Sequence, residues 1–335
     1  MGHFLVRFFL FLLLLGALAG GAAFWWLNQP LGMIQVPGAE SVDLSIEPGT
    51  SARGVAQAVA DAGVKVNPTL LYAWFRLSGK DRQIKASSYE LAPGATPRAL
   101  LQKLVQGEEA LRTVTLVEGW TFAQMREALL TSEQLKPDTK GLDARQIMEK
   151  LGRTGVAAEG RFFPDTYAYA KGSSDLVLLQ RAARAMDKKL DAAWTQRAAD
   201  SPLKSPEQAL ILASIVEKET GKGSDRPQIA GVFTNRMRLG MPLQTDPTVI
   251  YGMGAKFDGN LRKRDLQTDT PWNTYTRRGL PPTPIAMPGK SALLAAVLPA
   301  QTKALYFVAR GDGSSQFSAT LDEHNQAVNK YQRGQ

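Results

Sequence analysis

The first feature of the chain is an uninterrupted apolar run near its N-terminus. Phe8 to Leu27 is twenty residues without a charge, follows Arg7 and ends beside Trp25 and Trp26. About twenty apolar residues are enough for a helix to cross a bilayer, and tryptophan favours the interface. The pattern therefore predicts a transmembrane helix. A cleaved signal peptide is the alternative, because Ala17-Leu18-Ala19 has the A-x-A form, but the apolar run continues past it and favours a retained span.

After a short linker, residues 30–41, with Pro30, Pro37 and Gly38, the polar and apolar positions show a weak internal repeat. Its two copies are SIEPGTSARGVAQAV, from Ser45, and ELAPGATPRALLQKL, from Glu90. Each predicts a short strand, a Pro-Gly turn, a Ser or Thr N-cap and an amphipathic helix. A third, looser copy begins at Leu116 and opens the next domain.

The repeat predicts a small strand-helix-helix-strand module over residues 42–110. This module resembles a LysM-like carbohydrate-binding fold. A packing domain that only separates the rest of the chain from the membrane fits the same sequence equally well.

A buried helix is predicted in the second domain, residues 111–335, from about Pro206 to Thr220. Ser205 is a suitable N-cap, Gln208 stands where it would complete a capping box, and Gly221 is suited to end the helix. Between these ends, apolar residues cover nearly every direction of the helix, which predicts that it lies in the domain core.

Two carboxylates, Glu217 and Glu219, occupy the last turn of this helix. Glu219 is in line with Leu212, Ile215 and Val216, the most apolar stripe, whereas Glu217 lies on a more mixed face. We therefore expect Glu219 to lose more water. Burial and the negative end of the helix dipole both raise the pKa of a carboxyl group, as a general acid near neutral pH requires. Ordinary helix-end residues paired with nearby lysine or arginine are the alternative.

Composition narrows the chemistry that is available. The 335 residues include no cysteine and two histidines, His3 and His324. Cysteine nucleophiles, disulfides, cysteine-rich zinc sites and H-E-x-x-H metallopeptidases are therefore excluded, and no G-x-S-x-G elbow accompanies His324. If the chain is an enzyme, carboxylates are left to do the acid and base work. No metal or cofactor motif is visible.

The net charge of +9 suggests an anionic neighbour. For an exported, anchored protein this means a membrane surface or an acidic wall polymer. Nucleic acid is not expected, because export argues against it and no run of five basic residues occurs.

Two downstream segments are rich in rigid turns and polar aromatic residues. They are LQTDPTVIYGMG, from Leu243, and PWNTYTRRGLPPTPIAMPG, from Pro271. Aromatic faces stack on sugar rings, while amides and hydroxyls bind hydroxyl and N-acetyl groups, so these loops are suited to a sugar-binding groove.

Several segments together identify a resemblance. LASIVEKET, FTNRMRLGMPLQTDPTVIYGMG, NTYTRRGLPPTPIAMPG and YFVARGDGSSQFSATLDEHN resemble the YceG-like family of endolytic murein transglycosylases. The likeness is dense in the second domain and weaker in the first. It implies an α+β protein with an N-terminal transmembrane helix, residues 1–29, a LysM-like module, and a larger mixed α+β catalytic domain. It also implies a single-pass inner-membrane protein with its C-terminal bulk in the periplasm.

The resemblance further implies a reaction and a set of residues. The family's catalytic glutamate precedes Thr in its EKET motif, which corresponds to Glu219 here. Cleavage of the β-1,4 bond between N-acetylmuramic acid and N-acetylglucosamine in nascent peptidoglycan would give 1,6-anhydro ends and terminate strand growth, beside peptidoglycan synthases (penicillin-binding proteins). Glu217 could tune the pKa of Glu219. The residues expected to bind substrate are Gln244, Thr245, Asp246, Tyr251, Asn273 and Tyr275.

Two other functions remain open. A non-catalytic wall-binding scaffold would use the same groove and make Glu219 structural. A hydrolytic muramidase would give reducing ends in place of anhydro ends, and it ordinarily needs two carboxylates flanking the bond.

Overall fold

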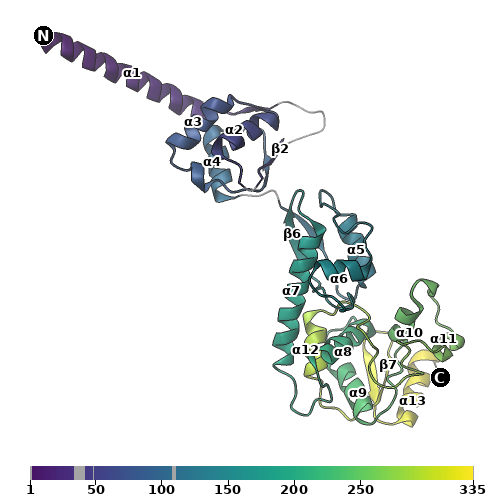
Figure 1. Ribbon diagram of the computed structural model, residues 1–335. Helices are drawn as coiled ribbons and strands as arrows, with labels where there is room; N and C mark the ends of the chain where they lie inside the picture. The colour runs from purple at the N-terminus through teal and green to yellow at the C-terminus, as the bar shows by residue number, and fades with distance from the viewer. Residues whose placement is uncertain (1, 34–41, 48, 108–110, 335) are drawn as a thin grey trace. The chain divides into compact units, whose positions relative to one another are not determined.

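The computed structural model describes residues 2–33, 42–47, 49–107 and 111–334 (Figure 1). Much of the predicted linker, including Pro37 and Gly38, lies outside these residues. The chain divides into two compact units, Met1–Arg112 with Ala170–Gly172, and Thr113–Tyr169 with Ser173–Gln335. It is a mixed α+β protein with one N-terminal apolar helix.

The predicted membrane span is a helix. Helix α1 runs over Gly2–Asn28, and its segment Val6–Asn28 is long and apolar enough to cross a membrane. Large apolar side chains along it are exposed, among them Phe9 at 70% and Leu18 at 65%. Since the first unit does not cover these side chains, the helix fits a single-pass anchor.

The rest of the first unit packs helices against short antiparallel strands. Strand β2 (Val42–Ser45) pairs with β4 (Ser88–Leu91), and β1 (Gly32–Met33) pairs with β3 (Val64–Lys65). The helices are α2 (Ala52–Asp61), α3 (Pro68–Leu77), the 3-10 turn η1 (Asp81–Gln83) and α4 (Pro97–Gln106). The predicted strand-helix-helix-strand order is present, with α4 following it. Its likeness to a LysM fold stays a prediction.

The three predicted copies of the repeat each form a strand, a turn and a capped helix. Ser51, Thr96 and Thr121 are the N-caps, and the side chain of each accepts a hydrogen bond from a backbone N–H of its helix. The residue two positions before each cap is a glycine with φ of +85°, +88° and +76°. Only glycine adopts this backbone conformation at little cost, which explains why the turn recurs with glycine at that position.

From Leu111 onward the chain is mainly helical. The strands are β5 (Leu111–Thr115), which pairs with β6 (Thr166–Ala170), and β7 (Tyr306–Ala309), which pairs with β8 (Ser315–Ser318). The helices are α5 (Phe122–Leu130), α6 (Ala144–Lys150), α7 (Asp175–Trp194), α8 (Pro206–Glu219), α9 (Arg226–Arg238), α10 (Asp246–Met253), the 3-10 turn η2 (Gly254–Lys256), α11 (Lys263–Gln267), α12 (Lys290–Val297) and α13 (Leu321–Gln332).

Helix α8 is the centre of this second unit, as predicted. It packs against α7, α9, α10 and α12, and every residue from Ala209 to Glu217 is buried. Ser205 caps it, but Gln208 bonds to the N–H of Lys204 instead of completing a capping box. The helix ends at Glu219, one residue earlier than predicted, because Thr220 is already extended at φ −150°. A rigid, buried helix therefore fixes the position of its last residue.

Candidate functional site

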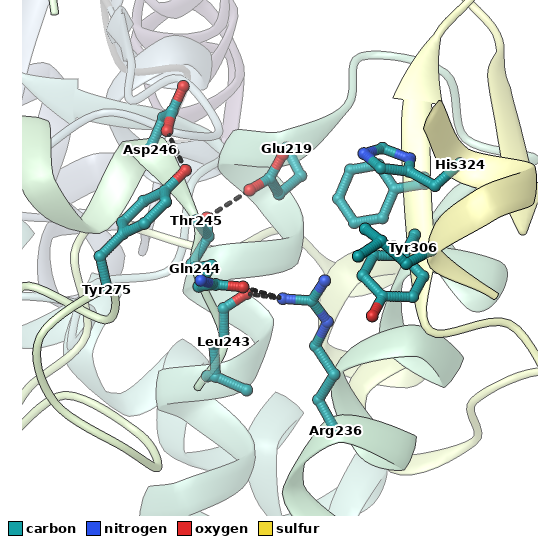
Figure 2. Close-up of a pocket in the computed structure, with 11 residues that line it drawn as sticks. Glu219, Arg236, Leu243, Gln244, Thr245, Asp246, Tyr275, Tyr306 and His324 are labelled. Atoms are coloured by element: carbon teal, nitrogen blue, oxygen red, sulfur yellow. Dashed lines mark hydrogen bonds between the residues drawn. The ribbon is translucent and has the colours of Figure 1, made fainter. Parts of the chain in front are cut away.

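The side chain of Glu219 lines a cavity of about 390 Å³ in the second unit (Figure 2). The walls come from the segment before α10, from α9, and from the C-terminal β7 and α13. The lining residues are Glu219, Arg236, Leu243, Gln244, Thr245, Asp246, Tyr275, Tyr306, Phe307, Leu321 and His324. Four of the six predicted substrate-binding residues, Gln244, Thr245, Asp246 and Tyr275, are thus brought together with Glu219.

The Glu219 carboxyl group has a single hydrogen bond in the part of the chain that the structure describes. The hydroxyl of Thr245 donates it to Oε1. Burial raises the pKa of Glu219 to about 7, the nearby negative charge of Asp246 adds to the increase, and the Thr245 bond partly offsets it. No salt bridge reaches Glu219 from the described residues. The group therefore keeps its proton in mildly acidic solution and can release it near pH 7.

Glu217, two residues earlier, has a different environment. Its carboxylate forms a salt bridge of 2.7 Å with Arg226 and accepts a hydrogen bond of 2.8 Å from the N–H of Gly289. Its side chain is only 4% exposed, whereas Glu219 is partly exposed, so the expectation that Glu219 would be the more buried of the two is wrong. The expected tuning of Glu219 by Glu217 stays a prediction, and the carboxylate whose charge adds to the raised pKa of Glu219 is Asp246.

Arg236, on α9, shapes the segment that lies opposite Glu219. Its Nη1 donates to the backbone oxygen of Leu243 at 2.9 Å and to Oε1 of Gln244 at 3.2 Å. Its Nε donates to the oxygen of Leu305, just before β7, at 2.7 Å. Gln244 has φ of +51°, a conformation that costs a non-glycine residue on the order of 1 kcal/mol. Arg236 therefore holds a strained segment and the β7 wall of the cavity together.

Threonine hydroxyls fix the position of Thr245. Its N–H donates to Oγ1 of Thr274 at 3.1 Å, and its carbonyl accepts from the hydroxyl of Thr248 at 2.7 Å. Thr248 and Thr274 share a further hydrogen bond of 2.9 Å. All three threonines are buried, so the hydroxyl that meets Glu219 is held by a network inside the protein.

Tyr275 and Asp246 form the side of the cavity next to Thr245 (Figure 2). The Tyr275 hydroxyl donates to Oδ1 of Asp246 at 2.6 Å. Burial and the Asp246 carboxylate raise the pKa of Tyr275, so the phenol keeps its proton. Two carboxyl groups therefore line the cavity: Glu219, which can give a proton, and Asp246, which accepts the hydrogen bond from Tyr275.

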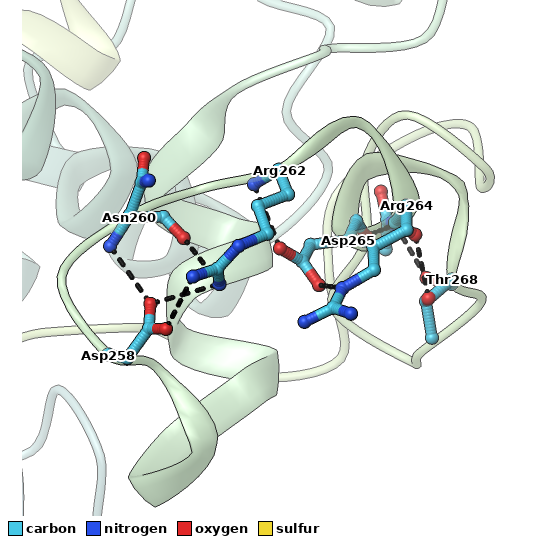
Figure 3. A network of polar contacts seen from close by, with 7 residues as sticks. Asp258, Asn260, Arg262, Arg264, Asp265 and Thr268 are labelled. Atoms are coloured by element: carbon cyan, nitrogen blue, oxygen red, sulfur yellow. Dashed lines mark hydrogen bonds and ion pairs between the residues drawn. The ribbon is translucent and has the colours of Figure 1, made fainter.

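Asn273 does not line the cavity beside Glu219, nor the larger cavity beside Tyr251 that is described below. It is fully buried, and its amide donates to the backbone oxygens of Leu266 at 3.0 Å and Thr268 at 2.7 Å. Figure 3 shows the polar network around α11, which includes the salt bridge of 2.7 Å between Asp258 and Arg262. Asn273 therefore positions the loop before Tyr275, and the structure gives no support for contact with substrate.

Tyr251 faces a second, larger cavity, of about 860 Å³. Its ring packs edge-on against Trp272 at 5.5 Å. Lys218 and Pro247 also line this cavity, and each is the sequence neighbour of a residue that lines the first, Glu219 and Asp246. Both cavities are therefore lined by the end of α8 and the start of α10, on different side chains.

A buried carboxyl group that the sequence did not indicate, Glu159, also lines the second cavity. It is 8% exposed, accepts from the N–H of Phe122 at 3.0 Å, and accepts from the Tyr251 hydroxyl at 3.2 Å. Burial raises its pKa to about 7. Glu159 precedes a glycine in a segment with no helical apolar stripe, so no periodicity marked it.

The sequence also did not predict the residues that β7 and α13 contribute to the first cavity. Tyr306 and His324 stack at 5.2 Å, and the Arg236 guanidinium lies over the Tyr306 ring at 5.0 Å. Burial and the Arg236 charge lower the pKa of His324, so its imidazole is neutral at pH 7. Tyr306 and His324 fall within a segment that carried the family resemblance, but no spacing within it singled them out. Among the described residues, no group of three or more His, Asp or Glu side chains could hold a metal ion.

Comparisons with known proteins identify the family. A family model, described as the YceG-like family, matches residues 44–330. The chain is 31% identical over 328 residues to an endolytic murein transglycosylase of Bacillus subtilis, covering 93% of this chain and 90% of that protein. This chain belongs to the YceG-like family.

More distant similarities agree. An endolytic murein transglycosylase of Streptococcus pneumoniae is 28% identical over 366 residues, which cover 97% of this chain and 64% of that protein. A crystal structure of a yceG-like protein from Listeria monocytogenes superposes with a TM-score of 0.53 at 28% identity, covering 86% of this chain and 98% of that one. The fold is therefore shared well beyond the segments around Glu219.

Proposed function

We propose that this protein is a lytic transglycosylase that cleaves the β-1,4 bond between N-acetylmuramic acid and N-acetylglucosamine in peptidoglycan strands. The observation that carries the proposal is Glu219, a carboxyl group with a pKa of about 7 that lines a cavity and has no salt bridge among the described residues. The names of the family's relatives in Bacillus and Streptococcus support the same substrate and reaction class.

Glu219 would act twice in one turnover. Its protonated carboxyl group gives a proton to the glycosidic oxygen as the bond to the anomeric carbon breaks. The resulting carboxylate then takes the proton of the muramyl 6-hydroxyl, whose oxygen attacks the anomeric carbon and closes a 1,6-anhydro ring. The proton returns to Glu219 and no water is consumed. One product carries the new hydroxyl group at the broken bond, and the other carries the 1,6-anhydro ring.

One free acid is sufficient for this reaction because the nucleophile belongs to the substrate. A hydrolase would need a second carboxylate to activate water or attack the sugar. The other carboxylate that lines the cavity, Asp246, accepts a hydrogen bond from Tyr275, and its charge adds to the raised pKa of Glu219. We assign Asp246 the further role of stabilising positive charge that develops at the anomeric carbon.

Gln244, Thr245 and Tyr275 would bind the sugar that is cleaved, with Thr245 also orienting Glu219. Tyr251 would bind a neighbouring sugar in the second cavity, where its ring and Trp272 present aromatic surface. A strand that crosses both cavities would be held on either side of the bond to be cut, as an enzyme that cuts within strands requires.

We further propose the cellular setting. Helix α1 would anchor the enzyme in the inner membrane with the second unit in the periplasm, where it would cut nascent strands beside peptidoglycan synthases (penicillin-binding proteins) and so end their growth. If α1 is retained, the mature protein keeps its N-terminus and stays with membranes after a high-salt wash. A mature N-terminus at Gly20 would refute the anchor without affecting the assignment of Glu219.

The test is incubation of the purified full-length chain with uncrosslinked peptidoglycan strands, followed by mass analysis of the products. Anhydromuramyl ends are expected, with internal fragments appearing before single disaccharides. Reducing ends would make the protein a muramidase, and unchanged strands that still bind the protein would make it a scaffold.

A further inference from the structure

Helix α3 of the first unit has two apolar faces. Leu71 and Phe75 are fully buried in the core of the unit. Leu70, Ala73 and Leu77 lie on another face, at the i, i+3 and i+7 spacing of a helical stripe, and Leu70 is 48% exposed while Leu77 is 85% exposed. A stripe of this kind on a domain surface indicates a site that contacts another apolar phase.

The outer stripe of α3 and the end of α1 line one cavity, of about 460 Å³. Helix α1 contributes Ala19, Ala22 and Trp25, and α3 contributes Leu70, Ala73 and Leu77. Every residue that lines this cavity is apolar. The exposed face of α3 is therefore continuous with the surface of the candidate membrane span.

This continuity fixes the depth of α3 when α1 crosses a bilayer. A helix rises about 1.5 Å per residue, so roughly twenty residues fill the hydrocarbon layer. With Phe8 to Leu27 in that layer, Trp25 lies at its edge and Ala22 lies about one turn inside. Side chains that share a cavity with Ala22, such as Leu77, must then lie at the same edge of the bilayer.

Next to this apolar cavity lies a basic one, of about 350 Å³. Trp74 lines both, and the second is also lined by Ser78, Lys80 and Arg98. The Arg98 guanidinium lies 5.8 Å from the ring of Phe24 on α1. In the part of the chain that the structure describes, neither Lys80 nor Arg98 forms a salt bridge, and the nearby carboxylate of Asp81 is paired with Arg76 at 2.8 Å.

The indole N–H of Trp74 marks the boundary between the two cavities. Its Nε1 is buried and has no hydrogen-bond partner among the described residues. A buried donor without a partner costs about 1–3 kcal/mol, and a tryptophan at a membrane interface bonds to the carbonyl or phosphate oxygens of lipid. The order from apolar to indole to basic matches the order from acyl chain to glycerol ester to phosphate.

We propose that the first unit binds the bilayer that holds α1, with the acyl chains of an anionic phospholipid against Leu70 and Leu77 and its phosphate group on Lys80 and Arg98. This surface is a second membrane contact beside the span. It keeps the first unit on the membrane surface. The proposal depends on α1 being retained and is independent of the reaction at Glu219.

The absence of cysteine makes a direct test available, because each introduced cysteine is unique. Leu77→Cys and Gln106→Cys are spin-labelled in the full-length chain and reconstituted in vesicles of mixed zwitterionic and anionic phospholipid. Both positions are exposed, and Gln106 ends α4 at the opposite end from Arg98. We expect the label at position 77 to collide with oxygen dissolved in lipid and the label at 106 to collide with a water-soluble nickel complex. Equal exposure of both labels to nickel would overturn the proposal.

The headgroup is tested separately with spin-labelled anionic and zwitterionic phospholipids. The chain is expected to immobilise the anionic lipid preferentially, and Lys80→Gln with Arg98→Gln should remove most of that preference, since basic residues at such a surface attract anionic headgroups. Lys103→Gln on α4 is the matched control and should change little. Loss of preference in the control alone, or no preference in the unmodified chain, would refute the phosphate site. Cleavage of peptidoglycan by the same samples reports separately on the function of Glu219.

Discussion

Glu159 and Glu219 line different cavities of the second unit, and burial raises the pKa of each to about 7. They differ in what they touch. Glu159 accepts hydrogen bonds from the start of α5 and from Tyr251 of α10, so it joins two elements. Glu219 accepts one, from Thr245, and its other oxygen has no partner among the described residues. A raised pKa thus identifies a buried carboxyl group, while its remaining contacts decide whether it supports the fold or is free to exchange a proton.

The largest expected effect separates the two residues by activity. Glu219→Gln keeps the shape but cannot protonate the leaving oxygen, so the rate of anhydro-product formation should fall about 10² to 10⁴-fold. The variant should fold, and its stability should be equal or higher, because a poorly solvated acid is removed. Glu159→Gln is the matched control and should keep most of the activity. The comparison fails if Glu159→Gln is as inactive as Glu219→Gln.

Glu217 provides a third case, a buried carboxylate that is fully paired. In Glu217→Gln the Arg226 side chain, 12% exposed, loses its counter-charge, so the free energy of unfolding should fall by about 2–3 kcal/mol. Activity per folded molecule should stay close to that of the unmodified enzyme. Denaturant melts and initial rates, both measured well below the melting temperature, separate the two effects. Loss of activity with unchanged stability would place Glu217 in the reaction.

The pH dependence tests whether the raised pKa of Glu219 has the stated cause. Its folded-state pKa of about 7 lies above the ordinary value of 4.5, so its protonated form stabilises the fold fully below about pH 4.5, and this stabilisation is lost as pH rises through 7. Between these limits the free energy of unfolding of the unmodified protein, measured by denaturant melts, should fall by on the order of 1–3 kcal/mol relative to that of Glu219→Gln.

Activity should follow the same titration. Because the reaction begins with the protonated acid, the rate should fall about tenfold per pH unit above pH 7. Burial is the main cause of the raised pKa and the Asp246 charge adds to it, so Asp246→Asn should move the descending limb slightly to lower pH. An unchanged limb in Asp246→Asn would mean that the Asp246 charge does not contribute to the pKa, and an unchanged limb in a variant that opens the site to water would mean that another group controls it.

The smallest expected effect concerns the link between Glu159 and Tyr251. Tyr251→Phe removes one hydrogen bond to a carboxyl group and keeps the ring that packs on Trp272, so stability should fall by about 1 kcal/mol. Strand binding should persist, since the aromatic surface remains. A large rise in KM would instead show that the Tyr251 hydroxyl contacts the strand.

The features that local sequence could predict are those fixed by local interactions. The N-caps Ser51, Thr96 and Ser205, the repeated turns and the burial of α8 all depend on residues within one or two helical turns. Glu219 was marked by its place at the end of a buried helix. The same helical spacing did not predict the burial of Glu217, because Gly289, whose N–H donates to the Glu217 carboxylate, lies 72 residues away in the chain.

The remaining parts of the site depend on contacts between distant segments. Arg236 reaches Leu305, 69 residues further along, and no pattern near Arg236 indicates that partner. Asn273 looked suited to sugars because its side chain is polar and lies in a loop, yet its amide is used to bind backbone oxygens. Whether a polar side chain faces a cavity or closes a loop is decided by tertiary packing, which composition does not report.

The bond between Arg236 and the Leu305 carbonyl also orders the assembly of the enzyme in time. A chain is synthesised from its N-terminus, so Glu219, Arg236 and Thr245 are made before Tyr306 and His324, which complete the cavity. Until these residues fold, the strained backbone at Gln244 lacks the support that Arg236 shares with β7. A chain that has not yet folded β7, β8 and α13 would therefore lack a complete cavity beside Glu219, and activity would appear only after these last elements have formed.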